Sequence, residues 1–544
     1  MAPDKVSGTD DEGDWRDFAM SRRRLLESGV AMSSALALSG CIDDLFGGGG
    51  EETSITITQQ VEPLEWDPVV INDVYSQQIA INIYDGLYEY DDDLSLVPRI
   101  AEDDPEVERD GTRFIFPIKE GVTFHNGDEL TAEDVEHTFL APVEDETENA
   151  DEVNMISDTE IIDDHTLQVD LEFPYGQFTT ATMARSVVNK EVRLEDREAY
   201  NLEEPIGTGP YEFVDWEQGD FVEIQVNEDY WNEDEMGLPN IDTVVYEPVD
   251  EDTTRITRLQ EESSEIIMGI PAQLWEDVEE MDHAYIEATE SISYFYLAFN
   301  CNEGPTATKE VREAIDYVFD MDQFIEEQLE PAGVRARATL PPGIAETWEL
   351  PVEEWNDEYS YDVDYDQAEA LLDEHAPDDW EPLIIVPPDD LRELLGEVVQ
   401  SGLEEIGYNA TVQRIDWGPF TDRYQSGDAD EFNMYALGWA GAGDPDAFMY
   451  PLFHEDNAGT NQGHFYDNQE VHDAILTARE STDYDERRGL YIEAIEQILA
   501  DKVHLPAYST QNSMGILNEL EDIQAHPASQ WNPRIFSHYN NATL

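Results

Sequence analysis

An apolar run at residues 432–439 is followed at once by glycines and then by a segment with helical character. So uniform an apolar pattern predicts a strand that is buried on both faces of a parallel sheet. Gly438, Gly441 and Gly443 lack side chains where this strand ends, so a ligand could approach the main chain there, with Trp439 as an aromatic wall. A plain turn after a buried strand has the same pattern, so the neighbouring elements must distinguish a ligand loop from a plain turn.

Strand and helix patterns alternate in front of this run. Strand patterns at 382–386 and 410–415 are each followed by a helix pattern, at 389–408 and 417–427. This alternation predicts a doubly wound α/β sheet. Ligands of such sheets bind beyond the carboxyl ends of the strands. The glycine segment is at such an end, which favours the ligand-loop hypothesis.

The first half of the chain has a different order of elements. A strand at 54–58 leads through a turn at 62–68 into a helix-like segment at 72–87, and further strands are expected at 113–119 and 166–173. Thr131 with Asp134 three positions later resembles a capping box at the start of a helix. Residues 205–231 have the pattern of a β-hairpin. We find no internal repeat.

Composition and charge exclude some functions. With 544 residues, the chain is long enough for two or three lobes. It has 27 Lys and Arg against 127 Asp and Glu, a net charge of −100, yet 40% of its residues are hydrophobic. A spread acidic surface on a patterned chain is typical of a protein that works in high salt, which screens its self-repulsion. Nucleic acid is not an expected partner, because binding it needs a basic surface.

Residues 1–40 have the pattern of an export signal. Arg22 and Arg23 precede an apolar run at 29–39 that is too short to span a bilayer. The paired arginines resemble a twin-arginine signal, and the sequence LSGC resembles a lipobox that ends in a lipid-modified Cys41. Residues 41–53 are glycine-rich and predict a flexible tether. We therefore expect a protein held by lipid at the extracellular face of the membrane.

Several ordered motifs carry a family resemblance. They are YDGLYEYDDDLSLVPRIAE from residue 84, FHNGDELTAEDV from 124, GTGPYEF from 207, VREAIDYVFD from 311, YDVDYDQAEALLDE from 361 and GWAGAGDPD from 438. In these the chain resembles the family 5 extracellular solute-binding proteins, the peptide-, dipeptide- and nickel-binding subunits of ATP-driven (ABC) importers. The resemblance covers nearly everything from about residue 54 onward.

The resemblance implies a two-lobed α/β fold of the large peptide-binding class, with a cleft that closes on its ligand. It implies lobe 1 at residues 54–291 with an inserted subdomain at about 86–199, lobe 2 at 292–505, and a return to lobe 1 at 506–544. It also implies delivery to membrane permease subunits, without catalysis, metal or cofactor, by a protein expected to be monomeric. Di- and oligopeptides are the expected ligands, and an oligosaccharide or a nickel chelate is the alternative.

The expected ligand site has two sides. On the lobe 2 side we expect Trp417, Tyr435, Gly438, Trp439, Gly441, Asp444 and Asp446, and on the lobe 1 side Glu62, Leu64, Met268 and Gly269. Peptide binders of this family usually have an aspartate three residues after the tryptophan, which pairs with the α-ammonium group. That position is Ala442 here, so either Asp444 or Asp446 would take the role.

Other chemistries lack their sequence patterns. The eleven histidines are scattered without the spacing of a zinc site. Neither a nucleophile elbow nor a phosphate-binding loop is present. Cys301 is expected to be a small buried residue and not a reactive thiol. The alternative class, a secreted acidic hydrolase, has no distinguishing pair of carboxylates.

Overall fold

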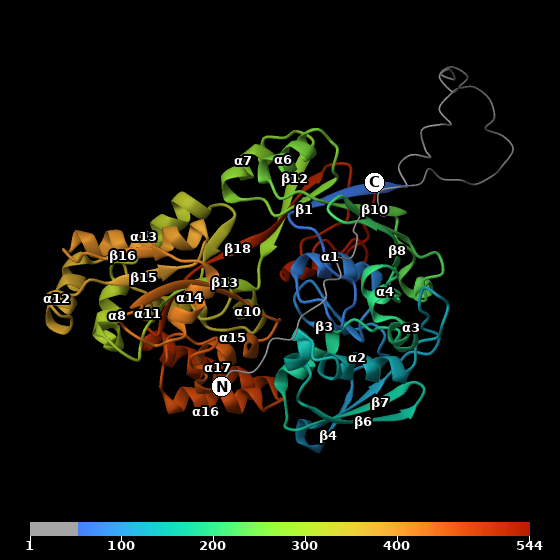
Figure 1. Cartoon of the computed structure of the whole chain (residues 1–544), viewed down its shortest axis with the longest axis horizontal. Coiled ribbons are helices and arrows are strands. Elements are labelled where there is room, and N and C mark those ends of the chain that lie inside the picture. Colours follow the sequence, from blue (N-terminus) through green and yellow to red (C-terminus); the bar gives the residue numbers. More distant parts are fainter. Residues whose placement is uncertain (1–52) are drawn as a thin grey trace, which may run out of the picture. The chain divides into compact units, whose positions relative to one another are not determined.

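The computed structural model describes residues 53–544. Its main sheet has twelve strands, with the order β16-β15-β17-β13-β18-β11-β1-β10-β9-β8 and with β12 and β14 paired to β18. Two halves can be distinguished in this sheet, because β1 and β8 to β12 come from residues before 291, whereas β13 to β17 come from residues after it. Figure 1 shows the same division among the helices. We refer to the two parts as the first and the second half-sheet.

The first half-sheet is built around β1 (Ser54–Gln59), the strand expected at 54–58. It pairs in parallel with both β10 and β11, and the expected hairpin β8–β9 follows β10 in antiparallel order. The bounds of its strands are Tyr211–Glu217 for β8, Phe221–Val226 for β9, Thr243–Pro248 for β10, Ile266–Met268 for β11 and Ala284–Glu290 for β12. Its helices are α1 (Val74–Ile83), α3 (Lys190–Glu195), α4 (Arg197–Leu202), α5 (Glu233–Met236), α6 (Asp252–Gln260) and α7 (Trp275–Glu279).

Residues between α1 and α3 form a separate four-stranded sheet with its own apolar core. The strands are β4 (Glu106–Glu108), β5 (Arg113–Pro117), β6 (Ile156–Asp163) and β7 (Thr166–Leu171), in the order β4-β5-β7-β6, beside the hairpin of β2 (Tyr88–Tyr90) and β3 (Leu96–Pro98). The helix α2 (Ala132–Glu144) begins with the expected capping box of Thr131 and Asp134. Phe114, Phe116, Phe139 and Phe178 pack together in its core, as expected of an independently packed unit.

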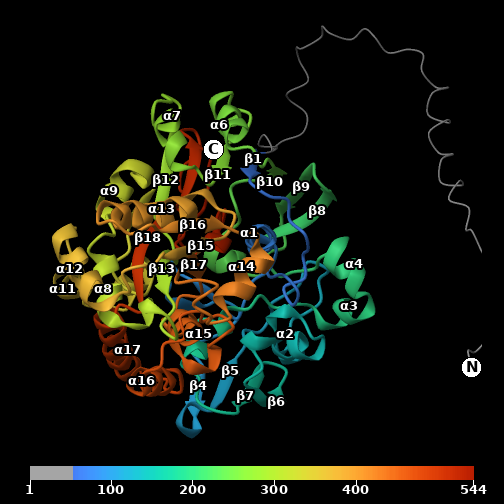
Figure 2. The ribbon, with the colours of Figure 1, turned by 60° about the vertical axis from the view of Figure 1, so that its left-hand side comes forward.

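The second half-sheet contains the predicted α/β alternation. The strands β15 (Leu383–Val386), β16 (Thr411–Arg414) and β17 (Met434–Ala440) are parallel, with α13 (Asp390–Glu405) and α14 (Trp417–Tyr424) between them (Figure 2). Further elements are β13 (Ser293–Phe299), β14 (Gly333–Arg335), α8 (Lys309–Asp316), α9 (Met321–Phe324), α10 (Pro342–Thr347), α11 (Val352–Tyr359), α12 (Tyr365–His375), α15 (Asp446–Phe453), α16 (Gln469–Arg479) and α17 (Tyr484–Ala500).

The expectation that β17 lies in a parallel sheet is confirmed on one side only, where β17 pairs with β15. On its other side β17 pairs antiparallel with β13, from Ser293↔Ala440 to Phe299↔Met434. The two strands are far apart in sequence, so the apolar pattern of β17 reports its burial and not the direction of its neighbour. Burial also ends before the strand does, because Met434 to Leu437 are buried whereas Trp439 is partly exposed.

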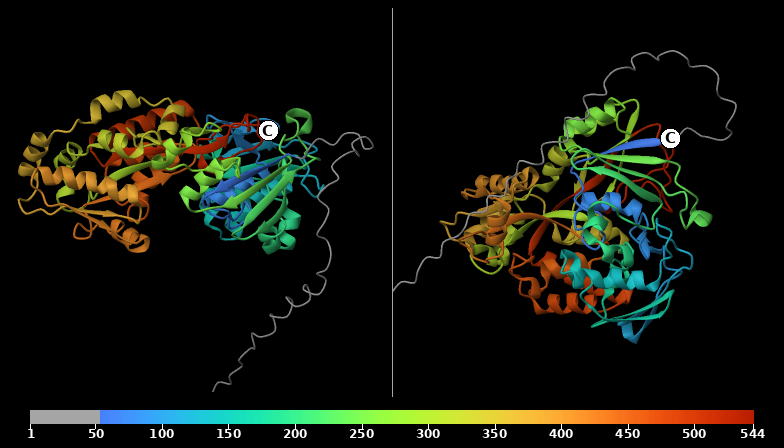
Figure 3. Two further views of the ribbon diagram at one scale, coloured as in Figure 1. Left: turned by 90° about the horizontal axis from the view of Figure 1, so that it is seen from above. Right: turned by 45° about the vertical axis from the view of Figure 1, so that its right-hand side comes forward.

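The long strand β18 (His504–Leu517) joins the two half-sheets. It pairs with β13 as far as Tyr508 and with β12 from Gln511 onward, so one continuous strand belongs to both. Figure 3 shows this red strand between the yellow and orange helices and the blue and green strands. The second link is the short connection from β12 to β13 at Ser291 and Ile292. Because residues 53–544 pass from one half-sheet to the other only in these two segments, we regard them as the natural hinge.

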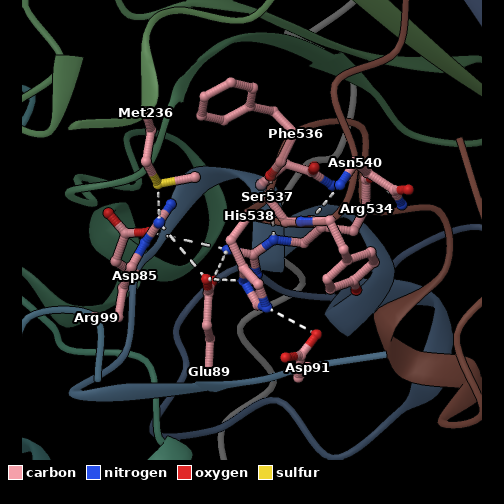
Figure 4. A network of polar contacts seen from close by, with 12 residues as sticks. Asp85, Glu89, Asp91, Arg99, Met236, Arg534, Phe536, Ser537, His538 and Asn540 are labelled. Carbon is pink, nitrogen blue, oxygen red and sulfur yellow. Dashed lines mark hydrogen bonds and ion pairs between the residues drawn. The ribbon is translucent and has the colours of Figure 1, made fainter. Parts of the chain in front are cut away.

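A buried network of charges fixes the C-terminal segment to the β2–β3 hairpin (Figure 4). Glu89 in β2 pairs with Arg534 at 3.0 Å, with Arg99 at 3.5 Å and with Nδ1 of His538 at 2.7 Å. Burial acts to raise the pKa of Glu89, but these three cations outweigh it and lower the pKa to about 2. The other ring nitrogen of His538 lies 2.9 Å from Asp91, in the turn of the hairpin. The C-terminal residues thus hold the hairpin in place.

Among residues 53–544, no helix is both long and apolar enough to cross a membrane.

Candidate functional site

The predicted ligand loop lies at the carboxyl end of β17, as the sequence indicates. At Gly438 the ring of Phe295 packs directly on the backbone, and a Cβ atom would lie 2.6 Å from that ring. Trp439 points to the opposite face of the sheet, and its indole Nε1 donates to the carbonyl oxygen of Ala447 at 2.8 Å. Gly438 therefore makes room for an aromatic ring, while Trp439 is held by the first turn of α15. Tyr435 lies deeper in the strand and is buried.

An arginine that the sequence analysis did not identify stands at the same edge of the sheet. Arg392, in the first turn of α13, places its guanidinium 5.2 Å from the ring centre of Phe295 and 5.3 Å from that of Trp417. Its Nε atom is buried and has no hydrogen-bond partner among the described residues. Trp417 begins α14 and is 49% exposed, which is unusual for so large an aromatic side chain. Together these side chains form an aromatic site with a positive charge at the carboxyl ends of β15, β16 and β17.

Asp444 and Asp446, the two candidates for an ammonium partner, are both fully buried. Asp444 accepts from Arg487 at 2.6 Å and from the backbone N–H of Asp446 at 2.8 Å. Asp446 pairs with Arg479 and accepts from the hydroxyl of Tyr491 at 3.3 Å. Burial raises the pKa of Asp446 to about 6, against the opposing effect of Arg479. The pairs fasten the start of α15 to α16 and α17, so an ammonium role for either carboxylate would require a pair to be broken.

The glycine loop also contacts the region of the β2–β3 hairpin. The Thr180 hydroxyl donates to Asp444, and Leu94 and Tyr90 each approach within 3.5 Å of the Cβ position of Gly443. A Cβ atom at 443 would be in ordinary van der Waals contact with these two side chains. The glycine loop, which belongs to the second half-sheet, therefore also contacts the region of the β2–β3 hairpin. The sequence could not indicate this contact, because the partners are more than 250 positions away.

The predicted residues of the first half-sheet lie at one edge as well, because β1 and β11 are parallel neighbours. Gly269 has φ +64°, and a Cβ there would lie 3.0 Å from the Gln60 side chain, so the segments after the two strands touch. Met268 is buried and pairs with Met514 of β18, whereas Leu64 is 56% exposed. One carboxylate oxygen of Glu62 is buried without a hydrogen-bond partner among the described residues.

The predicted residues thus lie in two groups, one in each half-sheet. The predictions at Arg22, Arg23 and Cys41 lie outside the described residues. Cys301 is partly buried, and burial raises the pKa of its thiol to about 11, which disfavours the reactive thiolate. Arg392, Phe295 and Thr180 are the residues that sequence reasoning missed. Arg392 could have been identified from the sequence, because it is a basic residue soon after a predicted strand in a chain with few basic residues.

Two lobes of α/β structure that share a hinge of crossing strands, with an aromatic site at a sheet edge, define a class of solute-binding proteins. The comparisons agree. The model of the bacterial extracellular solute-binding proteins, family 5 (Middle), matches residues 95–460, and the chain belongs to this family. Its motifs at residues 124, 207, 311 and 438 fall within the matched range, so the sequence-based resemblance is confirmed.

The curated relatives are named as binding proteins. The chain is 27% identical over 453 residues to the glutathione-binding protein GsiB of Pectobacterium atrosepticum, covering 80% of this chain and 84% of the relative. It is 25% identical over 540 residues to the oligopeptide-binding protein AppA of Bacillus subtilis, covering 93% and 97%. The solved structure of AppA in complex with a nonapeptide matches with a TM-score of 0.70 at 22% identity, covering 91% of this chain and 99% of that one.

Proposed function

We propose that this protein is the receptor of an ABC importer and that it captures a di- or oligopeptide between its two lobes for delivery to the permease. Membership of the family supports the receptor class, and the names of the two curated relatives support a peptide. Closure is driven by the ligand, which shifts the equilibrium by its higher affinity for the closed state. No covalent chemistry is needed for this function.

Arg392 is the observation that carries the proposal. Among the described residues its guanidinium makes neither an ion pair nor a hydrogen bond, although the chain contains 127 acidic residues. Such a cation beside an exposed tryptophan is suited to a carboxylate of the ligand, because a guanidinium binds a carboxylate through two parallel hydrogen bonds. The backbone of the glycine loop and the ring of Trp439 would contact the remainder of the peptide.

The test compares peptide termini in calorimetric titrations. We expect a short peptide to lose affinity when its C-terminal carboxylate is amidated, and Arg392→Gln to abolish this difference. A hydrogen bond to a charged group contributes about 1.5 to 3 kcal/mol, so we expect a loss of at least about tenfold. The matched control is Arg423→Gln, whose arginine pairs with Glu431. Equal binding of amidated and free peptides by the wild type would refute the role of Arg392.

The same titrations test the ligand class. A peptide library that gives no heat, while an oligosaccharide or a nickel chelate does, would overturn the peptide assignment and keep the receptor. Turnover of a peptide or a glycan would instead support the hydrolase alternative. Acetylation of the peptide amine tests whether an acid such as Asp444 or Asp446 recognises the ammonium group.

We further propose that the protein is an extracellular lipoprotein, monomeric and adapted to high salt. The LSGC sequence at Cys41 and the arginines at 22 and 23 support the lipoprotein, and the net charge of −100 supports the adaptation to high salt. Replacement of Cys41 by Ser should release the protein from the membrane fraction. A variant that sediments with membranes as completely as the wild type would refute the anchor. A single acyl chain binds membranes only marginally, so we expect a second chain or a further contact.

A further inference from the structure

A polar pocket that is separate from the candidate site lies on the second half-sheet, at the edge of β18 opposite to β13. Its volume is about 490 Å³, within the range of small-molecule sites. Its walls are the connection from α8 to α9, the end of β14, and α11 with the residues that follow it. Figures 1 and 2 both show α11 beside α8 and α12. Because β14 and β13 pair with opposite edges of β18, this pocket is separate from Trp439 and the glycine loop.

Two arginines in this pocket have no acidic partner. Nη1 of Arg335 donates to the carbonyl oxygens of Pro506 and Ala507, each at 3.0 Å, and Nη1 of Arg337 donates to the side-chain oxygen of Asn356. Neither forms an ion pair with any residue in the range 53–544, and burial lowers the pKa of Arg335 to about 10. A guanidinium has five N–H donors, so most donors of this pair are left for a ligand.

Four aspartates complete the charged lining of the pocket. Asp320 accepts from the backbone N–H of Gln323 at 3.1 Å and so caps α9. The other three, Asp322, Asp357 and Asp362, are exposed at the rim and make no ion pair among the described residues. With two positive and four negative side chains, the lining has an excess of negative charge. A free phosphate or a dicarboxylate would be repelled by this rim, and a simple diamine would leave both arginines without a partner.

We propose that this pocket is a second binding site, which takes a free amino acid with a basic side chain. The carboxylate of the amino acid binds between Arg335 and Arg337, and its two ammonium groups lie toward the aspartates of the rim. Such a molecule has a net charge of about +1 at neutral pH, which complements the excess of acid. This site is independent of the proposed peptide site, because no side chain is shared between them.

The test uses the full chain and three probes in calorimetric titrations. L-Lysine carries all three groups, cadaverine lacks the carboxylate, and 6-aminohexanoate lacks the α-ammonium group. We expect L-lysine to bind and each analogue to bind at least about tenfold more weakly, since each loses a charge-assisted contact. Cadaverine that binds as tightly as L-lysine would overturn the proposal, because the arginines would then play no part. Absence of any heat with L-lysine would overturn it as well.

Two variants locate the binding. Arg337→Gln removes one guanidinium and leaves the contacts of Arg335 with β18. Asp357→Asn neutralises a carboxylate that is exposed to solvent, so no buried contact is lost. Each should weaken L-lysine binding about tenfold, by the loss of one contact to a charged group, and Arg337→Gln should also remove the preference over cadaverine. The control Arg392→Gln should leave L-lysine affinity unchanged. If Arg392→Gln abolishes L-lysine binding while Arg337→Gln does not, the amino acid binds at the peptide site and this proposal is wrong.

Discussion

Replacement of Asp444 by Asn separates a structural role of this residue from a ligand-binding role. The carboxylate lies 2.6 Å from the guanidinium of Arg487, and the two side chains are 0% and 3% exposed. Removal of one partner of such a buried pair destabilises a protein by about 3 to 5 kcal/mol, because the other charge stays buried without compensation. Asp446 is close enough to compensate part of the charge of Arg487. We therefore expect a loss of about 3 kcal/mol, the lower end of that range.

Urea denaturation followed by circular dichroism measures this effect, and the exposed Asp456→Asn is the matched control. A double-mutant cycle with Arg487→Met isolates the pair, and the double variant should lose less than the two single losses combined. An Asp444→Asn variant with the midpoint of the wild type would refute the structural role. If that variant in addition no longer distinguished free from acetylated peptide, the ammonium role of Asp444 would be established instead.

Three further predictions follow from other sites. Gly438→Ala places a methyl group 2.6 Å from the ring of Phe295, so we expect a loss of about 1 to 3 kcal/mol in a thermal melt, together with weaker peptide binding; an unchanged melt contradicts the packing. Burial lowers the pKa of His125 and His526 to about 4 and that of His464 to about 3. Because the unfolded chain binds these protons more tightly, the stability is present above about pH 6.5 and falls toward pH 4, which a pH series of urea midpoints would test. The net charge of −100 predicts a higher melting temperature in molar salt than in dilute buffer, since the Debye length falls from about 30 Å at 0.01 M to about 3 Å at 1 M.

Local patterns predicted the elements of this fold well, because each depends on residues close in sequence. The capping box at Thr131 and the strand β1 are both present as expected. The parallel order of β15, β16 and β17 was also predictable, since the alternation of strands and helices is typical of a parallel sheet. The antiparallel partner of β17 was not, because β13 lies more than a hundred positions away and its apolar pattern has no preferred direction.

The sequence predicted where in the fold the candidate residues lie, and their role in binding stays a prediction. The carboxyl edge of the sheet is a general consequence of the fold, so the placement of Trp417, Gly438 and Trp439 at this edge could be predicted. The carboxylates were harder to assign, because 127 acidic residues make any acid near the loop look suitable. Only the three-dimensional positions of Arg479 and Arg487, more than 30 residues further on, show that Asp444 and Asp446 already have partners.

Under the proposed function, the positions of Ala442 and Arg392 together favour one end of a peptide as the recognised group. An alanine at 442 removes the carboxylate that peptide binders of the family usually direct at the ammonium group, and the next two acids of the loop are paired with arginines. Arg392 by contrast is a cation without an acidic partner among residues 53–544, in a chain with almost five acids per base. The long-range field of so acidic a protein repels a carboxylate, so a ligand with that group needs a specific and desolvated cation to bind. For the proposed peptide ligand we therefore expect recognition through the carboxyl end, and the comparison of amidated with acetylated peptides tests this.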